Sequence, residues 1–163
     1  TGKGRDVMGE GVPSDELDTV THIVRAYGFP VWHPGETPDQ KCGKQKRCAE
    51  FVPPAVKLGA QVAALGLRFY EGTSFPDIYR NSLFIAEHGS WNRSKLAGYQ
   101  VVGVRFGPDG KPQQPDVVVS GFQKNEHSWG RPTDVQPMPD GSLLISDDKA
   151  GALYRLTYDG KPQ

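Results

Sequence analysis

A short polar stretch between two predicted strands carries most of the side chains that could bind a ligand. The stretch contains Ser90, Trp91, Asn92, Arg93 and Lys95, and it follows an apolar run in SLFIAEHGSWNR. An apolar run that ends abruptly in charged and polar residues is typical of a buried strand that meets solvent or a ligand. Because loops on a rigid scaffold often carry function, we expect this stretch to form part of a binding site.

The same pattern occurs a second time, which indicates an internal repeat. Ser82–Arg93 is echoed by Ser142–Lys149, each is followed by a second predicted strand, and each hairpin ends on Asp-Gly-Lys-Pro-Gln. The two pentapeptides begin at Asp109 and Asp159, 50 residues apart. Propeller blades repeat every roughly 40–50 residues, whereas a sandwich needs no such repeat. The repeat therefore favours a β-propeller over a β-sandwich.

The elements that position these residues are expected to be short antiparallel strands, so the predicted class is all-β. The 20 glycines and 14 prolines are typical of a chain with many tight turns. A helix is the competing prediction for Ala55–Leu67, although Gly59 and Gly66 disfavour it. Asp116–Ser120 is a β-branched run and is predicted to be a buried strand. Further strands are predicted at Asp18–Tyr27, Gln61–Tyr70, Gly98–Phe106, Pro132–Pro137 and Gly151–Tyr158, loops at Gly2–Leu17 and Gln123–Gly130, and a turn at Phe75–Asn81.

Composition excludes some classes of function. The 19 basic and 19 acidic residues cancel, and no long basic cluster is available for nucleic acid or an anionic membrane. No run reaches the roughly 18 apolar residues of a spanning helix. Cys42 and Cys48 lie in a polar loop, where a local disulfide and two free thiols both stay open. The sequence has no GxSxG motif, P-loop or Rossmann fingerprint.

Three separated motifs make the chain resemble a known family. They are GEGVPSDELDTVTHIVRAYGFP, SLFIAEHGSWNRSKLAGYQVVGVRF and GRPTDVQPMPDGSLLISDDKAGALYRLTY. In this order they are similar to motifs of the soluble glucose/sorbosone dehydrogenases, and the L-sorbosone dehydrogenase-like branch shares the HGSWNR motif. The resemblance implies a six-bladed β-propeller that uses pyrroloquinoline quinone (PQQ) and calcium to oxidise sugars or aldehydes.

The resemblance also implies how the chain is organised. It matches the C-terminal half of the family, which corresponds to about three four-stranded antiparallel blades of roughly 40–50 residues each. We expect a single partial propeller domain over residues 1–163. Its parts are an acidic loop and strand (1–33), a surface excursion with the cysteine pair (34–52), a middle blade region (53–122) and the last blade (123–163). The family's general-base histidine lies on earlier blades, so no catalytic residue is assigned to this chain.

Four residues are implied as ligands of the cofactor. In the family an arginine placed like Arg131 points into the central funnel and pairs with the carboxylates of the quinone, which suits a planar bidentate donor. His88, Asn92 and Arg93 lie where the family sends a lysine toward the cofactor. This chain has no lysine there, so His88 or Arg93 would replace it as the cation. The alternatives are a blade-edge ion pair for Arg131 and a solvated loop with a capping histidine for the others.

Calcium ligands are implied in the acidic loop. Asp15, Glu16 and the carbonyl of Tyr27 resemble a calcium site found in part of the family. Calcium takes about six to eight hard oxygen ligands, which carboxylates and carbonyls of such a loop can supply. The alternative is a solvated acidic turn. A second, catalytic calcium would be held mainly by backbone carbonyls within Gly9–Val12.

We therefore expect part of a PQQ- and calcium-dependent sugar or aldehyde dehydrogenase that is inactive alone. Its expected partners are a sugar or aldehyde substrate and either the missing N-terminal half of the propeller or a second copy of itself, with no nucleic acid or membrane. The expected location is periplasmic or secreted. The alternatives are a non-catalytic scaffold propeller that lacks the general base, and a calcium-dependent lactonase-like hydrolase.

Overall fold

The computed structural model describes residues 8–20, 26–29, 31–33, 37–47 and 50–160. Within these ranges the chain forms short strands and a 3-10 turn but no α-helix. The elements in chain order are β1 (Ser14–Leu17), β2 (Trp32–His33), β3 (Thr37–Pro38), β4 (Val56–Ala60), β5 (Ala64–Tyr70), η2 (Asp77–Tyr79), β6 (Ser82–Glu87), β7 (Gln100–Val104), β8 (Asp116–Val119), β9 (Gln123–Lys124), β10 (His127–Ser128), β11 (Pro132–Pro137), β12 (Leu143–Asp147) and β13 (Ala152–Leu156). The all-β class is confirmed. The helix considered for Ala55–Leu67 is wrong, because this segment forms β4 and part of β5. No helix in the described ranges could cross a membrane.

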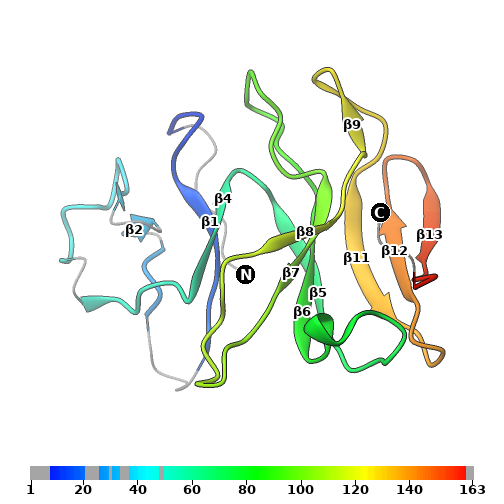
Figure 1. Ribbon diagram of the computed structural model, residues 1–163. Coiled ribbons are helices and arrows are strands. Elements are labelled where there is room, and N and C mark those ends of the chain that lie inside the picture. Colours follow the sequence, from blue (N-terminus) through cyan, green and yellow to red (C-terminus); the bar gives the residue numbers. More distant parts are fainter. Residues whose placement is uncertain (1–7, 21–25, 30, 34–36, 48–49, 161–163) are drawn as a thin grey trace.

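Three antiparallel sheets lie side by side (Figure 1). The first pairs β1 with β4, the second has the order β5-β6-β7-β8, and the third has the order β11-β12-β13. In the second and third sheets, β6 and β12 hold the second position, and β7 and β13 hold the third. The two copies of the sequence repeat are therefore equivalent hairpins of neighbouring blades.

The sheets differ from the expectation in strand number and in burial. About three four-stranded blades were expected, but in the described residues the three neighbouring sheets have two, four and three strands, and β2–β3 and β9–β10 form two further two-stranded sheets. Ser14–Leu17, predicted as loop, is a strand because it pairs with β4, and Gln123–Gly130 contains the β9–β10 hairpin. Asp116–Ser120 forms β8 but is not buried: Val117 is 55% exposed, because β8 is the outermost strand of its sheet. The strand predicted at Asp18–Tyr27 falls largely on residues 21–25, outside the described ranges, and the described residues around them are not in strands.

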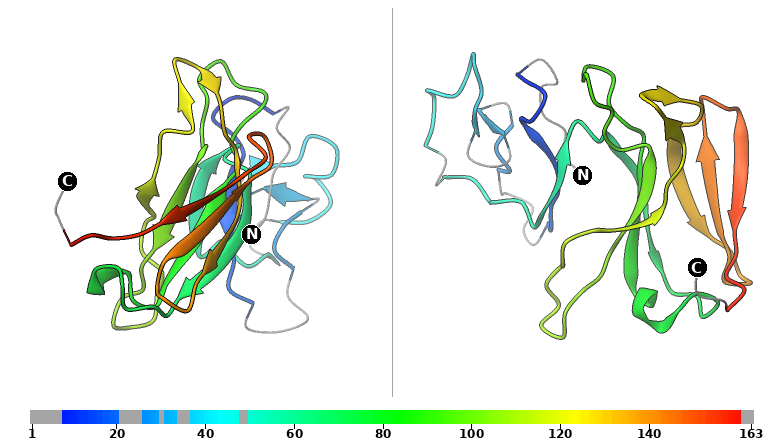
Figure 2. Two further views of the ribbon diagram at one scale, coloured as in Figure 1. Left: turned by 90° about the vertical axis from the view of Figure 1, so that its right-hand side faces the viewer. Right: turned by 45° about the horizontal axis from the view of Figure 1, so that its top comes forward.

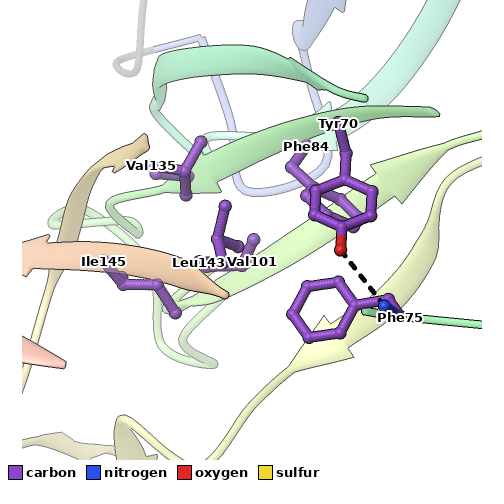
Figure 3. Packing of buried hydrophobic residues seen from close by; sticks show 8 residues of the cluster. Tyr70, Phe75, Phe84, Val101, Val135, Leu143 and Ile145 are labelled. Atoms are coloured by element: carbon purple, nitrogen blue, oxygen red, sulfur yellow. Dashed lines mark hydrogen bonds between the residues drawn. The ribbon is translucent and has the colours of Figure 1, made fainter. Parts of the chain in front are cut away.

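The main hydrophobic core fills the space between the second and third sheets (Figure 3). Its buried members are Tyr70, Phe75, Phe84, Ala86, Val101, Val135, Leu143 and Ile145. The Tyr70 hydroxyl donates to the carbonyl of Gly141 at 2.6 Å and accepts from the amide of Phe75 at 3.1 Å. Because both bonds are buried, this phenol fixes the turn before β12 against β5 without leaving a polar atom unpaired.

A second core lies between the first and second sheets, so β6 is buried on both faces. Leu83 and Ile85 point into this second core, whereas Phe84 and Ala86 point into the first. All six residues of β6 are buried. This explains why the repeat begins with an unbroken apolar run rather than an alternating one.

The inner strands of the second and third sheets approach each other closely at Gly66. A Cβ atom at Gly66 on β5 would lie 2.6 Å from the Cα of Asp134 on β11. Only glycine leaves room for this contact of two backbones. The contact holds the two blades at a fixed spacing on the inner side.

Loops from all three sheets gather at one end of the molecule, at the top of Figure 1 and again in the right-hand view of Figure 2. They are the loop before β1 (residues 8–13), the β6–β7 loop (88–99), the β9–β10 hairpin and the β12–β13 turn (148–151). Most of the predicted site residues lie in or beside these loops.

Candidate functional site

Arg131 is fixed at the start of β11 by its backbone and its side chain. Its amide donates to Oδ1 of the buried Asp147 at 2.9 Å. The preceding Gly130 is required here, because a Cβ atom would lie 2.3 Å from Oδ2 of Asp147. The guanidinium donates from Nε to the carbonyl of His88 at 3.1 Å and from Nη2 to the carbonyl of Gly89 at 2.6 Å. It also lies 5.4 Å from the centre of the Tyr99 ring, within the range of a cation–π contact.

This arrangement leaves part of the guanidinium available to a ligand. Five N–H bonds are available on an arginine side chain, and two of those on Arg131 are engaged with the β6–β7 loop. Its Nη1 has no partner within the described ranges. A half-buried, oriented guanidinium with unused donors is suited to binding a carboxylate.

His88 is brought to the same place, together with a residue that the sequence did not single out. Nε2 of His88 lies 2.9 Å from Oδ1 of Asp148, on the turn after β12. The hydrogen bond to His88, helped by the positive charges of His88 and Arg131, holds the pKa of Asp148 below its ordinary value. Asp148 could have been noticed because it occupies the position of His88 in the second copy of the repeat. His88, Arg131 and Asp148 thus form one charged cluster across two blades.

Arg93 is directed away from this cluster and braces the loop before β1. Its guanidinium donates to the carbonyls of Glu10 and Ala60, and Nε donates to the carbonyl of Lys95 at 3.0 Å. Asn92 precedes it in the same loop. The structure therefore brings His88 and Arg131 together and uses Arg93 in contacts with backbone.

Two carboxylates tie the β6–β7 loop to its neighbours on either side. Glu10 accepts from the amide of Ser94 at 2.9 Å and from its hydroxyl at 2.8 Å, and these bonds lower the pKa of Glu10. Glu126, at the tip of the β9–β10 hairpin, accepts from the amide of Leu96. The β6–β7 loop is thereby held between the loop before β1 and the β9–β10 hairpin.

The predicted calcium ligands lie on and after β1. Asp15 is 1% exposed, and its Oδ2 accepts from the amide of Ala63 at 2.7 Å. Burial, with the charges of Asp18 and Asp15, raises the pKa of Glu16 to about 7, and burial also raises that of Asp18. The hydroxyl of Tyr27 donates to the carbonyl of Thr19 at 3.3 Å. The described residues contain no group of three or more His, Cys, Asp or Glu side chains that could hold a metal.

The surface excursion is organised around a pair that the sequence left unassigned. His33 and Asp39 are both buried, and Nε2 of His33 lies 2.9 Å from Oδ2 of Asp39. Oδ1 of Asp39 accepts from the amide of Cys42 at 3.0 Å. Cys42 forms no disulfide within the described ranges, and Cys48 and His22 lie outside them, so the pairing of the two cysteines stays a prediction.

Three fanned antiparallel sheets, with loops and a charged cluster at one end, define part of a β-propeller. Solved structures with this fold include the "Calcium structure of Trichoderma reesei Carbohydrate-Active Enzymes Family AA12" (TM-score 0.70, 21% identity, 95% of this chain and 45% of that one). The "Holo form of Pyranose Dehydrogenase PQQ domain from Coprinopsis cinerea" matches with a TM-score of 0.67 at 23% identity, over 91% of this chain and 45% of that one. A glucose dehydrogenase matches with a TM-score of 0.65 at 21% identity, over 93% and 39%.

The sequence places the chain in a family. Residues 13–159 match the family model described as TrAA12-like, so the chain belongs to the TrAA12-like family. It is also 37% identical over 161 residues to an uncharacterized protein of Borreliella burgdorferi, which covers 96% of this chain and 42% of that protein. The chain thus spans less than half the length of these relatives. The resemblance found in the sequence is confirmed for the family and for the β-propeller fold.

Proposed function

We propose that this chain is the cofactor-anchoring part of a PQQ- and calcium-dependent sugar or aldehyde dehydrogenase. The observation that carries the proposal is the Arg131 guanidinium, which is oriented by the carbonyls of His88 and Gly89 and keeps Nη1 unused within the described ranges. PQQ carries carboxylates, and an oriented arginine is the side chain best suited to them. Similarity to the PQQ-bound domain of Coprinopsis cinerea supports the same assignment.

The residues present fit the quinone through the charged cluster. Arg131 would bind a carboxylate of the cofactor, and His88 would provide a second donor beside it, oriented by Asp148. When bound, the quinone would supply the hydride acceptor for the sugar, and calcium would polarise the quinone. The cluster itself would anchor and orient the cofactor.

The loop before β1 fits a calcium ion through backbone oxygens. Within Gly9–Val12, the carbonyl of Gly9 accepts from Gln61 and that of Glu10 accepts from Arg93. The carbonyls of Gly11 and Val12 accept no hydrogen bond from the described residues. Hard carbonyl oxygens are ligands that calcium prefers. For the other calcium, expected at Asp15, Glu16 and Tyr27, the supporting feature is the grouping of carboxylates: burial, with the charges of Asp18 and Asp15, raises the pKa of Glu16.

The proposal includes a partner and a location. The general base would come from the missing N-terminal half of the propeller or from a second copy, and the open edge of β13 is the surface on which either would continue the third sheet. The chain covers less than half the length of each relative, and this supports a partner that supplies the rest of the propeller. We place the protein in the periplasm or outside the cell, with a sugar or aldehyde as substrate.

The test is to add PQQ and calcium, separately and together, to the purified protein and to follow its melting temperature and the absorbance of the quinone. We expect the two ligands together to raise the melting temperature by several degrees, because a ligand that binds only the folded state stabilises it. Each ligand alone should have a smaller effect. No shift with either ligand would contradict the proposal and favour a non-catalytic scaffold.

A further inference from the structure

A groove separate from the Arg131 cluster lies between the first and second sheets. Its volume is about 340 Å³, which is within the range of small-molecule sites. One wall comes from β1 and β4, and the other comes from β6, β7 and the start of β8. The lining residues are Ser14, Lys57, Leu58, Gly59, Glu87, Gln100, Val102, Gln114, Pro115 and Val117.

Glu87 is a buried carboxyl group of this groove that lacks a cationic partner among the described residues. It is 1% exposed, and its Oε2 accepts from Nε2 of Gln100 at 2.7 Å. No Lys, Arg or His forms an ion pair with it in the described part of the chain. Burial, with a contribution from the charge of Asp15, raises its pKa to about 7. A buried carboxyl group that is bonded, among the described side chains, to a neutral amide alone is costly as an anion, and a cation would remove that cost.

The other polar side chains of the groove have unused hydrogen-bonding capacity. Lys57 and Gln114 have no side-chain partner in the described ranges, and Gln100 uses only its amino group. Amide groups donate and accept, as hydroxyl groups do. The ammonium of Lys57 donates only, and its charge disfavours a second positive charge on the same ligand.

We propose that this groove binds a small hydroxylated monoamine, of the chemical class of an amino sugar. The ammonium group of the ligand pairs with Glu87, which lines the groove beneath its surface. Its hydroxyl groups bind Gln100 and Gln114 and accept from Lys57. Leu58, Val102 and Pro115 supply the apolar contacts that bury the ring. The lining of this groove contains none of Arg131, His88 and Asp148, the residues of the proposed quinone site.

The experiment compares two probes that differ by one group. Saturation-transfer NMR on the purified protein is run with D-glucosamine and with D-glucose, in the absence of PQQ and calcium and with a chelator present. We expect D-glucosamine to bind with a millimolar dissociation constant and D-glucose to bind at least tenfold more weakly. Equal signals from the two sugars, or no signal from D-glucosamine, would overturn the proposal.

Variants locate the binding. Gln114→Ala is exposed enough to leave folding intact, and it should weaken D-glucosamine binding at least threefold. Glu87→Gln keeps the shape of the side chain and should abolish the preference for the amine. The matched control is Lys111→Met, an exposed lysine outside the groove, which should leave binding unchanged. Unchanged binding in both Gln114→Ala and Glu87→Gln would refute the site, whatever the outcome with PQQ and calcium.

Discussion

His88 and Asp148 join two neighbouring blades: Nε2 of His88, after β6, lies 2.9 Å from Oδ1 of Asp148, after β12. The two residues occupy the same position in the two copies of the repeat. The contact is reinforced by Arg131, whose guanidinium binds the carbonyls of His88 and Gly89 from the blade of Asp148. The ends of β6 and β12 are equivalent in the repeat but carry different side chains, a histidine and an aspartate. These two side chains can therefore pair and form part of the candidate site.

The contact between His88 and Asp148 stabilises the protein to a degree that depends on pH. Asp148 has a pKa lowered below its ordinary 3.8, so its contribution to stability is present above pH 3.8 and is lost as the pH falls through the lower, folded-state value. We expect Asp148→Asn to lower the urea midpoint at pH 7 and to have a smaller effect near pH 2.5. The matched control is Glu71→Gln, whose side chain makes no hydrogen bond or ion pair in the described ranges. An equal difference between wild type and Asp148→Asn at both pH values would contradict the pairing.

Replacing Arg131 by lysine tests the cofactor site while keeping the charge. Lysine lacks the planar fork that reaches the carbonyls of His88 and Gly89 and still presents donors to a ligand. We expect Arg131→Lys to weaken PQQ binding about 10- to 100-fold, since a hydrogen bond to a charged group contributes roughly 1.5–3 kcal/mol. Titration of the quinone absorbance measures this. Arg155→Lys, at an exposed pair with Asp140, is the control and should bind PQQ like the wild type.

The buried carboxyl group of Glu87 has the opposite pH dependence. Its pKa in the folded protein is about 7, above the ordinary 4.5, so its contribution is fully present below pH 4.5 and is lost as the pH rises through 7. We expect Glu87→Gln to be more stable than the wild type at pH 8.5, by up to roughly 3 kcal/mol, and to differ little at pH 5. Urea unfolding at the two pH values checks this. If the wild type loses no stability relative to Glu87→Gln between them, the neutral form of Glu87 is not favoured by burial.

Gly66 tests the spacing of the blades. A methyl group at this position would meet the backbone of Asp134, so neither strand can accept it without moving. We expect Gly66→Ala to destabilise the protein by roughly 1–3 kcal/mol, as overpacking does. Gly11→Ala is the control, because a Cβ atom there meets nothing within 4 Å. Thermal unfolding measures both, and equal melting temperatures would mean that the inner strands are not in contact.

The sequence predicted the strands better than it predicted their burial and the contacts of the site residues. The repeat predicted β6, β7, β12 and β13 and their propeller arrangement, because apolar runs and turn residues are local signals. The exposure of β8 was missed, since a β-branched run gives no information on whether a strand is central or outermost. The companions of the site residues were missed for the same reason. Asp148 next to His88 and the carbonyls bound by Arg93 depend on contacts between segments far apart in the chain.

The double burial of β6 has a consequence for strand alignment. When one face of a strand is exposed to solvent, the alternation of apolar and polar residues sets its register, because a slip of one residue turns the apolar face to water. β6 is apolar on both faces, so that signal is weak. Phe84 lies opposite Gly103 on β7, and a Cβ atom on Gly103 would be 3.2 Å from the Phe84 ring. A slip of one residue would put the Phe84 ring opposite a valine of β7. The absence of a side chain at Gly103 therefore fixes the register of β6 against β7.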